Sequence, residues 1–371
     1  MTQRRPAKPG DPVDAIETPA LVVELGALER NVNVLSRALS AGGVRLRPHA
    51  KSHKCVDIAK LQIERGAVGI CCQKTDEALA FVEAGIGDVL VTNEVVVPAK
   101  LDRLAVAAAS ATVGLLVDCA EGVELAGAAA ARAGTSLDLY VEVDVGAGRC
   151  GVSPDAAADL AALIAGKRNG RFAGLHCYHG AAQHLRTPEA RAAAIASARD
   201  RAQRALRAIN AKGIRCPIVT GAGTGTWTLE RDSGVWNELQ PGSYVFMDAD
   251  YARNTAGAAD VRFEQSLFVI ATVMSTNATD RVICDAGLKA FSFDSGPPVV
   301  HDREGVRYVK ASDEHGVLEV ERAARAPVLG ERVWLIPGHC DPTVNLYDWI
   351  VGIRDGRVVC VWSVAARGAL G

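Results

Sequence analysis

Hydrophobic and polar positions follow two different periods along most of the chain. Between residues 26 and 249, short apolar runs are separated by longer alanine-rich segments whose apolar residues recur every three or four positions. One such segment places four residues on one face of a helix, namely Leu28, Val32, Leu35 and Leu39. Eight parallel strands separated by helices are typical of a closed β/α barrel, and an open doubly wound sheet is the alternative. The predicted strands are Val44–Pro48, Val68–Cys72, Asp88–Val91, Val113–Val117, Leu137–Val143, Phe172–Tyr178, Pro217–Thr220 and Glu238–Tyr244.

The pattern changes after residue 250, where short strands follow one another with turns and little helix between them. We therefore predict an α/β protein with a (β/α)8 barrel over residues 26–249 and a second, mostly β domain over residues 250–371 plus 1–25, which includes the early strand Ala20–Glu24. The longest barrel helix is predicted to begin at Thr187-Pro188 and to end at Gly213. The later strands are predicted at Leu267–Met274, Arg281–Asp285, Tyr308–Val309, Val317–Val320, Arg332–Ile336, Trp349–Arg354 and Arg357–Ser363.

The composition excludes some classes of partner. The 371 residues carry a formal net charge of −2, so there is no excess of positive charge to attract nucleic acid or an anionic membrane. The polar N-terminus contains no signal-like apolar segment, and no apolar run approaches the roughly 20 residues that cross a bilayer. Ten irregularly spaced cysteines favour free thiols over disulfides. We expect a cytoplasmic protein that acts on a small molecule and has no nucleic-acid or membrane partner.

Candidate chemistry is concentrated where predicted strands end, which is where β/α barrels carry their active sites. The first such group is Arg47–Lys54, a polar turn after the first barrel strand. A neutral lysine forms Schiff bases, so Lys51 in this turn is a candidate carbonyl-condensing amine. Neighbouring cations would lower its pKa and favour the neutral form, and the candidates are His49, His53 and Lys54. A basic surface turn is the alternative interpretation.

Three further groups follow later strands. Glycines around Arg149 let the backbone approach a ligand beside a permanent positive charge, although a structural turn would look the same. Tyr178, His179 and His184 follow the next strand and are either site residues or core residues. Thr220–Thr226 alternates glycines with hydroxyl residues, which exposes N–H groups to a phosphate where such barrels often bind one. Its spacing is neither that of the dinucleotide fingerprint nor that of the P-loop.

A fifth group, His339-Cys340-Asp341, lies in the predicted β domain. In an extended segment, His339 and Asp341 would point to the same side and could bind one divalent ion, while Cys340 would point the other way. Two ligands of this kind also occur in ordinary surface turns, which is the alternative.

Taken together, these motifs resemble the fold-type III pyridoxal-phosphate enzymes, the group of the alanine racemase barrel, and within it the D-threonine aldolase and D-serine dehydratase branch. The resemblance covers nearly the whole chain in order. Ala222 departs from it, since a glycine is usual at that position. The matching segments are Thr18–Ala20, Arg47–Lys54, Gly69–Lys74, Glu142–Gly146, Gly148–Gly151, Tyr178–Gly180, Gly221–Gly225, Met247–Tyr251, Asp285–Lys289, Asp313–Gly316 and His339–Thr343.

The resemblance implies that the barrel binds pyridoxal phosphate and that the β domain contributes a metal site. Lys51 would be the Schiff-base lysine, Arg149 would lie near the pyridine nitrogen, and the Gly221–Thr226 turn would hold the phosphate. His339 and Asp341 would ligate a divalent cation. Dehydratases of this branch carry His-x-Cys there, whereas the oxygen ligand Asp341 favours Mn²⁺ or Mg²⁺. The implied cofactor-binding residues are Lys51, Gln73, Arg149, Tyr178, Thr220, Gly223, Thr224 and Gly225, and the implied catalytic residues are Lys51, His179 and His184.

The implied activity is retro-aldol cleavage of a D-β-hydroxy-α-amino acid of the D-threonine type to glycine and an aldehyde, by a homodimer. A metal-assisted dehydratase of D-serine or D-3-hydroxyaspartate, which gives a keto acid and ammonia, is the nearest alternative. A non-catalytic pyridoxal-phosphate carrier is a different class, and the β domain argues against it. The β-substituent stays open, because Arg253, Lys289 and Arg303 could each pair with a substrate carboxylate or simply lie on the surface.

Overall fold

The computed structural model describes residues 4–257 and 261–371, which form two sheets. Eight parallel strands make the first sheet, in the order β2-β9-β8-β7-β6-β5-β4-β3. Its two edges meet, because His49 and Cys71 form a parallel bridge and the Cys71 N–H donates to Pro48 O at 2.9 Å. The predicted barrel is therefore confirmed over the open doubly wound sheet. Its strands are β2 (Arg45–Leu46), β3 (Ile70–Cys72), β4 (Asp88–Glu94), β5 (Thr112–Val117), β6 (Leu137–Glu142), β7 (Gly170–Cys177), β8 (Val219–Gly221) and β9 (Glu238–Leu239).

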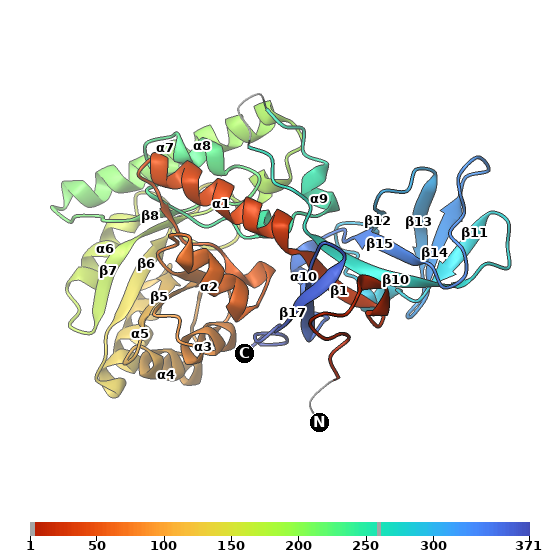
Figure 1. The fold of residues 1–371 in the computed structure, drawn as a ribbon. Helices are drawn as coiled ribbons and strands as arrows, with labels where there is room; N and C mark the ends of the chain where they lie inside the picture. Colours follow the sequence, from red (N-terminus) through yellow and green to blue (C-terminus); the bar gives the residue numbers. More distant parts are fainter. Residues whose placement is uncertain (1–3, 258–260) are drawn as a thin grey trace.

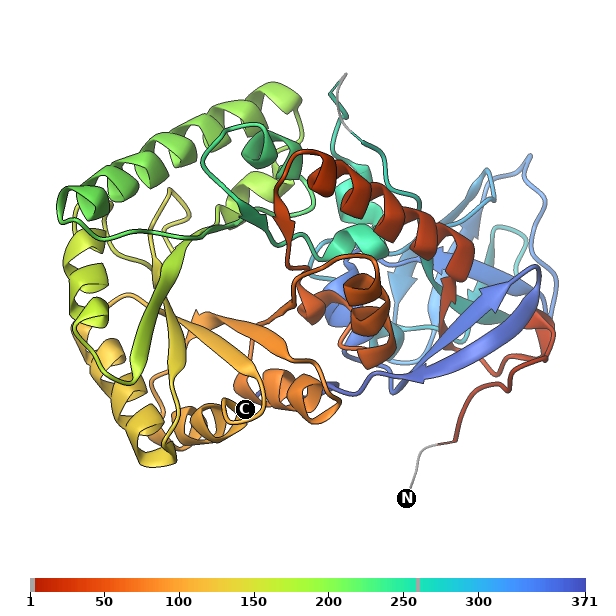
Figure 2. The same cartoon turned by 60° about the vertical axis from the view of Figure 1, so that its left-hand side comes forward.

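Helices surround the outside of this sheet (Figure 2). The predicted apolar face of the first helix is buried, with Leu28, Val32 and Leu35 fully inaccessible to solvent. The longest helix starts as predicted, because Thr187 Oγ1 accepts the Ala190 N–H at 3.2 Å, and Gly213 follows its end in a left-handed conformation. Within the described ranges, no helix is both long and apolar enough to cross a bilayer. The helices are α1 (Leu25–Ala41), α2 (Val56–Glu64), α3 (Thr75–Glu83), α4 (Pro98–Ala107), α5 (Ala120–Ala133), α6 (Ala157–Ala165), α7 (Pro188–Ala211) and α8 (Trp227–Arg231).

Two hydrophobic layers hold the barrel together. Alternate residues of a strand point to opposite faces, so Leu115 packs under the helices while the adjacent Leu116 points into the barrel. The interior cluster is small and consists of Cys71, Leu90, Leu116, Tyr140 and Ala173. The upper part of the barrel, toward the carboxyl ends of the strands, is thereby left to polar side chains.

One predicted strand is much shorter than expected. The segment 238–244 was predicted to be extended, but β9 ends at Leu239 and is followed by a 3-10 turn at Ser243–Val245. Pro241 has no N–H to give to a neighbouring strand. Gly242 packs so closely on the preceding turn that a Cβ there would lie 2.8 Å from His49 O. The chain therefore bends across the mouth of the barrel instead of extending β9.

The second sheet forms the mostly β domain at the right of Figure 1. β1 (Ala20–Glu24) pairs antiparallel with β10 and parallel with β16, so the N-terminal strand lies in the middle of this sheet. The short strand β12 and the helices α9 and α10 were not predicted. The remaining elements are α9 (Ala249–Ala252), β10 (Leu267–Ser275), β11 (Arg281–Cys284), β12 (Val299–Val300), β13 (Val306–Ala311), β14 (Gly316–Val320), β15 (Arg332–Ile336), α10 (Cys340–Val344), β16 (Trp349–Arg354) and β17 (Arg357–Ser363).

Candidate active site

A pocket of about 290 Å³ opens at the carboxyl ends of the barrel strands, facing the β domain. It brings together residues that follow six different strands, which is the arrangement expected of a β/α barrel active site. Seven of the sequence-predicted site residues line it: Lys51, Gln73, Arg149, Tyr178, His184, Gly223 and Thr224.

Lys51 lies in a 3-10 turn that His49 caps, because His49 Nδ1 accepts the Lys51 N–H at 3.3 Å. Its side chain is 40% exposed, and its ammonium donates to Asp341 Oδ2 of the β domain. Burial alone would lower the pKa of Lys51, but the Asp341 carboxylate outweighs burial and the pKa is raised. The prediction that neighbouring cations lower this pKa is therefore wrong.

The two histidines beside Lys51 are not cations at neutral pH. Burial lowers the pKa of His49 well below its ordinary value and that of His53 to about 4. Lys54 is buried on the other side of the turn, where its ammonium donates to Ala366 O at 3.4 Å and lies 4.0 Å from Glu77. Of the two lysines in the turn, only Lys51 faces the pocket.

The Gly221–Thr226 turn offers an unusual set of donors at one end of the pocket. Among the described residues, the N–H groups of Ala222, Gly223 and Thr224 have no hydrogen-bond acceptor, and the buried Thr224 Oγ1 has no partner. Three successive N–H groups and a hydroxyl fit a phosphate. Ala222 adopts a left-handed conformation with φ of 68°, which explains why glycine is usual at this position.

A buried glutamine, Gln183, supports this turn from behind. Its Oε1 accepts the Gly225 N–H at 2.9 Å, and its Nε2 donates to Thr226 Oγ1 at 2.8 Å. The contact is so close that a Cβ on Gly223 would lie 2.5 Å from Gln183 Oε1. The turn is therefore rigid on its far side and open toward the pocket.

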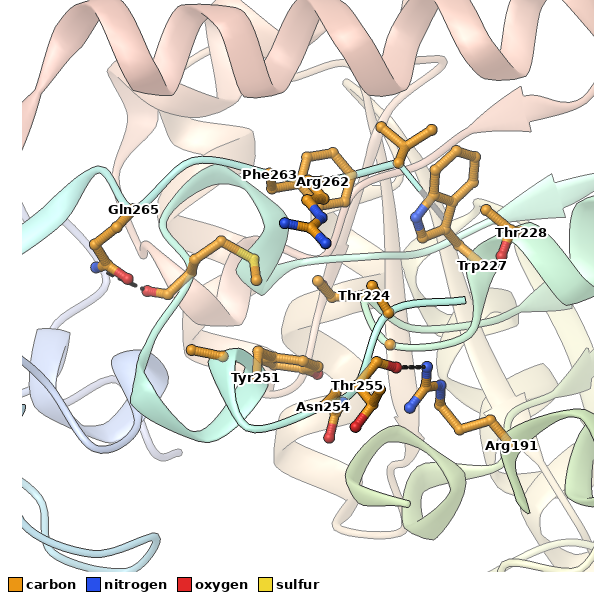
Figure 3. A pocket seen from close by; sticks show the side chains of 15 residues that line it. Arg191, Thr224, Trp227, Thr228, Tyr251, Asn254, Thr255, Arg262, Phe263 and Gln265 are labelled. Atoms are coloured by element: carbon orange, nitrogen blue, oxygen red, sulfur yellow. Dashed lines mark hydrogen bonds between the residues drawn. The ribbon is translucent and has the colours of Figure 1, made fainter. Parts of the chain in front are cut away.

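A second cavity, of about 370 Å³, lies beyond the same turn (Figure 3). Thr224 and Tyr251 line both cavities, whereas the predicted cofactor residue Gly225 lines only this one. Trp227 and Phe263 form an aromatic wall, and Arg191 is held by Thr255 O at 2.7 Å. Thr220, also predicted to bind cofactor, lies below the pocket and accepts a hydrogen bond from Gln240 Nε2 at 2.8 Å.

Arg149 extends over the ring of Tyr178, with its guanidinium carbon 5.8 Å from the ring centroid. It lies in a loop where Gly146, Gly148 and Gly151 have positive φ, which glycine tolerates best. Arg149 donates to Glu142 Oε1 at 3.3 Å. Burial raises the pKa of Tyr178, so its hydroxyl stays neutral.

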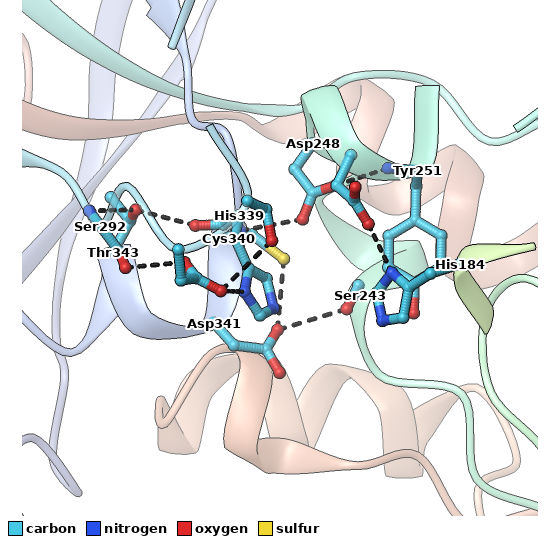
Figure 4. Close-up of polar contacts among 12 residues, drawn as sticks. His184, Ser243, Asp248, Tyr251, Ser292, His339, Cys340, Asp341 and Thr343 are labelled. Carbon is cyan, nitrogen blue, oxygen red and sulfur yellow. Dashed lines mark hydrogen bonds and ion pairs between the residues drawn. The ribbon is translucent and has the colours of Figure 1, made fainter. Parts of the chain in front are cut away.

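His339 and Asp341 lie side by side at the start of α10 (Figure 4). The segment is not extended as predicted, because His339 caps a helical turn in which Asp341 is an early residue. Asp294 Oδ2 accepts from His339 Nδ1 at 2.6 Å, and Ser243 donates to Asp341 Oδ1 at 3.2 Å. A carboxylate that orients a histidine is characteristic of metal-binding histidines, so this donor set fits a divalent cation.

The two histidines predicted to be catalytic differ in position. His184 lines the pocket, and its Nδ1 lies 2.5 Å from Asp250 Oδ2 (Figure 4). The Asp250 carboxylate also accepts from Arg186 and Arg253, which outweigh burial and lower its pKa to about 2. His179 does not line the pocket, and its buried Nδ1 has no partner among the described residues.

Two of the three basic residues considered for a substrate carboxylate are engaged elsewhere. Lys289 pairs with Glu314, and Arg303 pairs with Glu331. Arg253 is the exception, since it pairs with Asp250, the carboxylate that also contacts His184 in the pocket.

Several residues in or next to the pocket were not singled out from the sequence. Asp250 and Tyr251 lie in a matched motif, so a signal for them existed in the Met247–Tyr251 segment. Gln183, Ser243 and Asp294 have no such signal, because each acts through a contact with a residue far away in the sequence.

Two family models match the chain in succession. Residues 23–250 match "Alanine racemase, N-terminal domain", and residues 266–353 match "Putative serine dehydratase domain". The crystal structure of D-threonine aldolase from Filomicrobium marinum superposes with a TM-score of 0.97 at 46% identity, covering 99% of this chain and 100% of that one.

Curated relatives agree with this match. The chain is 48% identical to the D-threonine aldolase of Arthrobacter sp., over 98% of this chain and 96% of that protein. It is 46% identical to the 3-hydroxy-D-aspartate aldolase of Paracoccus denitrificans (strain Pd 1222), over 98% and 95%. A D-threo-3-hydroxyaspartate dehydratase from Delftia sp. (strain HT23) is more distant, at 30% identity over 90% and 93%.

Proposed function

This chain belongs to the D-threonine aldolase branch of the alanine racemase-like enzymes, and on that premise we propose that it cleaves D-β-hydroxy-α-amino acids to glycine and an aldehyde. The observation that carries the proposal is the contact between Lys51 of the barrel and Asp341 of the β domain. It brings the amine of Lys51 and a potential metal ligand, 290 residues apart in the sequence, into direct contact beside the pocket.

The cofactor implied by the family is pyridoxal phosphate, which supplies an electron sink for cleavage of a bond at the amino acid's α-carbon. We propose that residues 26–249 bind it, with Lys51 Nζ holding its aldehyde carbon. The unpaired N–H groups of Ala222, Gly223 and Thr224 would hold its phosphate. Arg149, Tyr178 and Gln73, which line the same pocket, would hold its ring.

His184 is the proposed base. Because its Nδ1 is next to the Asp250 carboxylate at 2.5 Å, a proton on Nδ1 is donated to Asp250 and Nε2 remains a free acceptor. His184 Nε2 can then take the proton of the substrate's β-hydroxyl, which is the proton that must leave when the Cα–Cβ bond breaks. His179 has no such partner or position, so we assign it no proton transfer.

His339 and Asp341 are the proposed ligands of a divalent cation, Mn²⁺ or Mg²⁺, which when bound would make the β-hydroxyl more acidic. One imidazole and one carboxylate leave coordination positions for a substrate oxygen and for water. Asp294 and Ser243 fix the orientation of these two ligands. By resemblance to the family we further propose a homodimer, which light scattering coupled to gel filtration would test.

Product analysis tests the activity. The purified protein loaded with pyridoxal phosphate is incubated with D-threonine or D-serine, with and without Mn²⁺. Equal amounts of glycine and acetaldehyde from D-threonine support the proposal, and 3-hydroxy-D-aspartate and D-phenylserine then define the β-substituent. Release of ammonia with a keto acid, and no glycine, would instead assign the dehydratase reaction.

A further inference from the structure

Glu142 lies next to Arg149 and His176, behind the residues that line the pocket. It is the last residue of β6, and only 4% of it is exposed. Its Oε1 accepts from Arg149 at 3.3 Å, and its Oε2 lies 3.6 Å from His176 Nδ1 on β7. The opposite nitrogen of His176 lies 3.2 Å from Gln240 Oε1, and both residues line the pocket. One buried carboxylate therefore contacts two side chains that face the cofactor position.

Arg149 depends on this contact for its position. Its loop is flanked by glycines with positive φ, and its side chain is 49% exposed. Among the described residues, Glu142 is its one ion-pair partner. Without Glu142, the guanidinium could turn toward solvent, because no other carboxylate within reach pairs with it.

A second carboxyl group, Glu94, supports Glu142 from the end of β4. The β4–β5 pairing changes register between Val91 and Glu94, and the Glu94 carboxyl group is close enough to that of Glu142 for the two to interact electrostatically. Glu94 Oε1 is buried and has no donor among the described residues. Two neighbouring buried carboxyl groups tend to share one proton, because two buried negative charges close together repel each other strongly.

The charges around the pair decide which carboxyl group holds the proton. Burial and the Glu142 carboxylate raise the pKa of Glu94 to about 7. For Glu142, His176 and Arg149 outweigh burial and lower the pKa to about 2. The other groups that face the pair are Asp118, which accepts the Gly151 N–H at 3.2 Å, and the Cys150 thiol.

We propose that Glu142 is a positioning residue, which holds Arg149 and His176 toward the cofactor ring, and that the neighbouring Glu94 carboxyl group helps to hold Glu142 in place. The inference rests on the proposed function, since it assumes that the pocket binds pyridoxal phosphate. It gives a role to Glu142, which lies in the matched Glu142–Gly146 segment, and adds Glu94, which lies in none of the matched segments.

A competing interpretation uses some of the same residues. Ligand atoms of Glu94, Asp118 and Cys150 lie within 4.8 Å of one another, close enough to bind a cation together. In that case Glu94 would be ionised. A protonated Glu94 and a metal-bound Glu94 respond in opposite ways to substitution by glutamine, which keeps a hydrogen-bond donor but loses the negative charge.

The test is a titration of the apoenzyme with pyridoxal phosphate at pH 6.5, followed by the absorbance of the bound cofactor. We expect Glu142→Gln to weaken binding at least tenfold and to shift the absorbance maximum, and Glu142→Asp to recover part of the loss. Glu94→Leu should weaken binding to a similar extent, and Glu94→Gln should recover most of that loss. Glu124→Gln, which removes an exposed carboxylate of α5 paired with Lys167, is the matched control.

Three results would overturn the proposal. Wild-type affinity and spectrum in Glu142→Gln would remove Glu142 from the positioning of Arg149. If Glu94→Gln weakens cofactor binding as much as Glu94→Leu does, the wild-type Glu94 is ionised. Calorimetric binding of Mn²⁺ to the wild type that is lost in Glu94→Gln would then assign Glu94, Asp118 and Cys150 as a cation site. If the wild type does not bind pyridoxal phosphate, both the aldolase function and the positioning role of Glu142 are refuted. If it binds the cofactor normally but gives no aldolase products, only the proposed aldolase reaction is refuted.

Discussion

Substitution of Gly223 by alanine tests the rigid side of the phosphate turn. The new Cβ would lie 2.5 Å from Gln183 Oε1 and 2.6 Å from Gln183 Cδ, so the whole buried side chain must move. That movement breaks the hydrogen bonds of Gln183 with Gly225 N and Thr226 Oγ1, at 2.9 and 2.8 Å. A buried polar group that loses its partner costs about 1–3 kcal/mol, so two lost bonds should destabilise the protein by about 2–6 kcal/mol.

Cofactor binding should weaken as well. If the displaced turn loses about 1.4 kcal/mol of its binding free energy for the cofactor, the dissociation constant of pyridoxal phosphate rises tenfold. The assay combines thermal unfolding of the apoenzyme with titration of pyridoxal phosphate. Gly127→Ala is the matched control, because a Cβ on Gly127 in α5 meets nothing within 4 Å and the change should stabilise that helix by about 0.5–1 kcal/mol.

A double-mutant cycle provides the refutation. In Gln183→Ala the hydrogen bonds are lost but space for the Cβ of residue 223 is created. Adding Gly223→Ala to that variant should therefore cost less than about 0.5 kcal/mol more. If the two changes are additive, or if Gly223→Ala alone binds the cofactor as tightly as the wild type, the turn is not braced by Gln183 as described.

Four further predictions follow from the site. Lys51→Ala should lose the covalently held cofactor, and its retention through gel filtration with an unchanged absorbance spectrum would contradict the assignment. Asp341→Asn should lower the rate of acetaldehyde release by about 10–100-fold and abolish its response to Mn²⁺, measured with and without a chelator. Asp250→Asn should lower kcat by about 100-fold or more with little effect on cofactor affinity, and an unchanged kcat would exclude His184 as the base. Burial raises the pKa of Glu230 to about 7, from an ordinary value of 4.5. Between pH 4.5 and pH 7 the folded protein therefore binds one proton that the unfolded chain does not, and the free energy of unfolding falls as pH rises through this range. Glu230→Gln should therefore match the wild type below pH 4.5 and exceed it by about 3 kcal/mol above pH 7, as measured by chemical denaturation at both pH values.

The barrel could be predicted from the sequence because its signal is local. The apolar face of α1 and the alternation of strands and helices depend on residues a few positions apart, and they fix which ends of the strands meet. Lys51, Arg149 and Thr224 each follow a strand, so their convergence in one pocket follows from the fold. The match of the whole chain to the family strengthened that prediction.

What could not be predicted depends on long-range contacts. The raised pKa of Lys51 comes from Asp341, which lies 290 positions later, whereas the nearby histidines that the sequence suggested are buried and neutral. The early end of β9 comes from packing of Gly242 on His49 O, together with a proline that could also have occurred inside a loop. Gln183 carries no motif, and only its contacts with the phosphate turn reveal its role.

The position of β1 has a consequence for synthesis of the chain. Its neighbours are β10 and β16, and β10 begins only at Leu267. A ribosome that adds about 5–20 residues per second needs on the order of 10–50 s to make the intervening stretch of about 250 residues. During that time β1 has no partner on either edge, although Leu21, Val22 and Val23 are fully buried in the finished protein. An apolar strand with two open edges is prone to pair with other chains, so the nascent N-terminal segment needs shielding until the last third of the chain emerges.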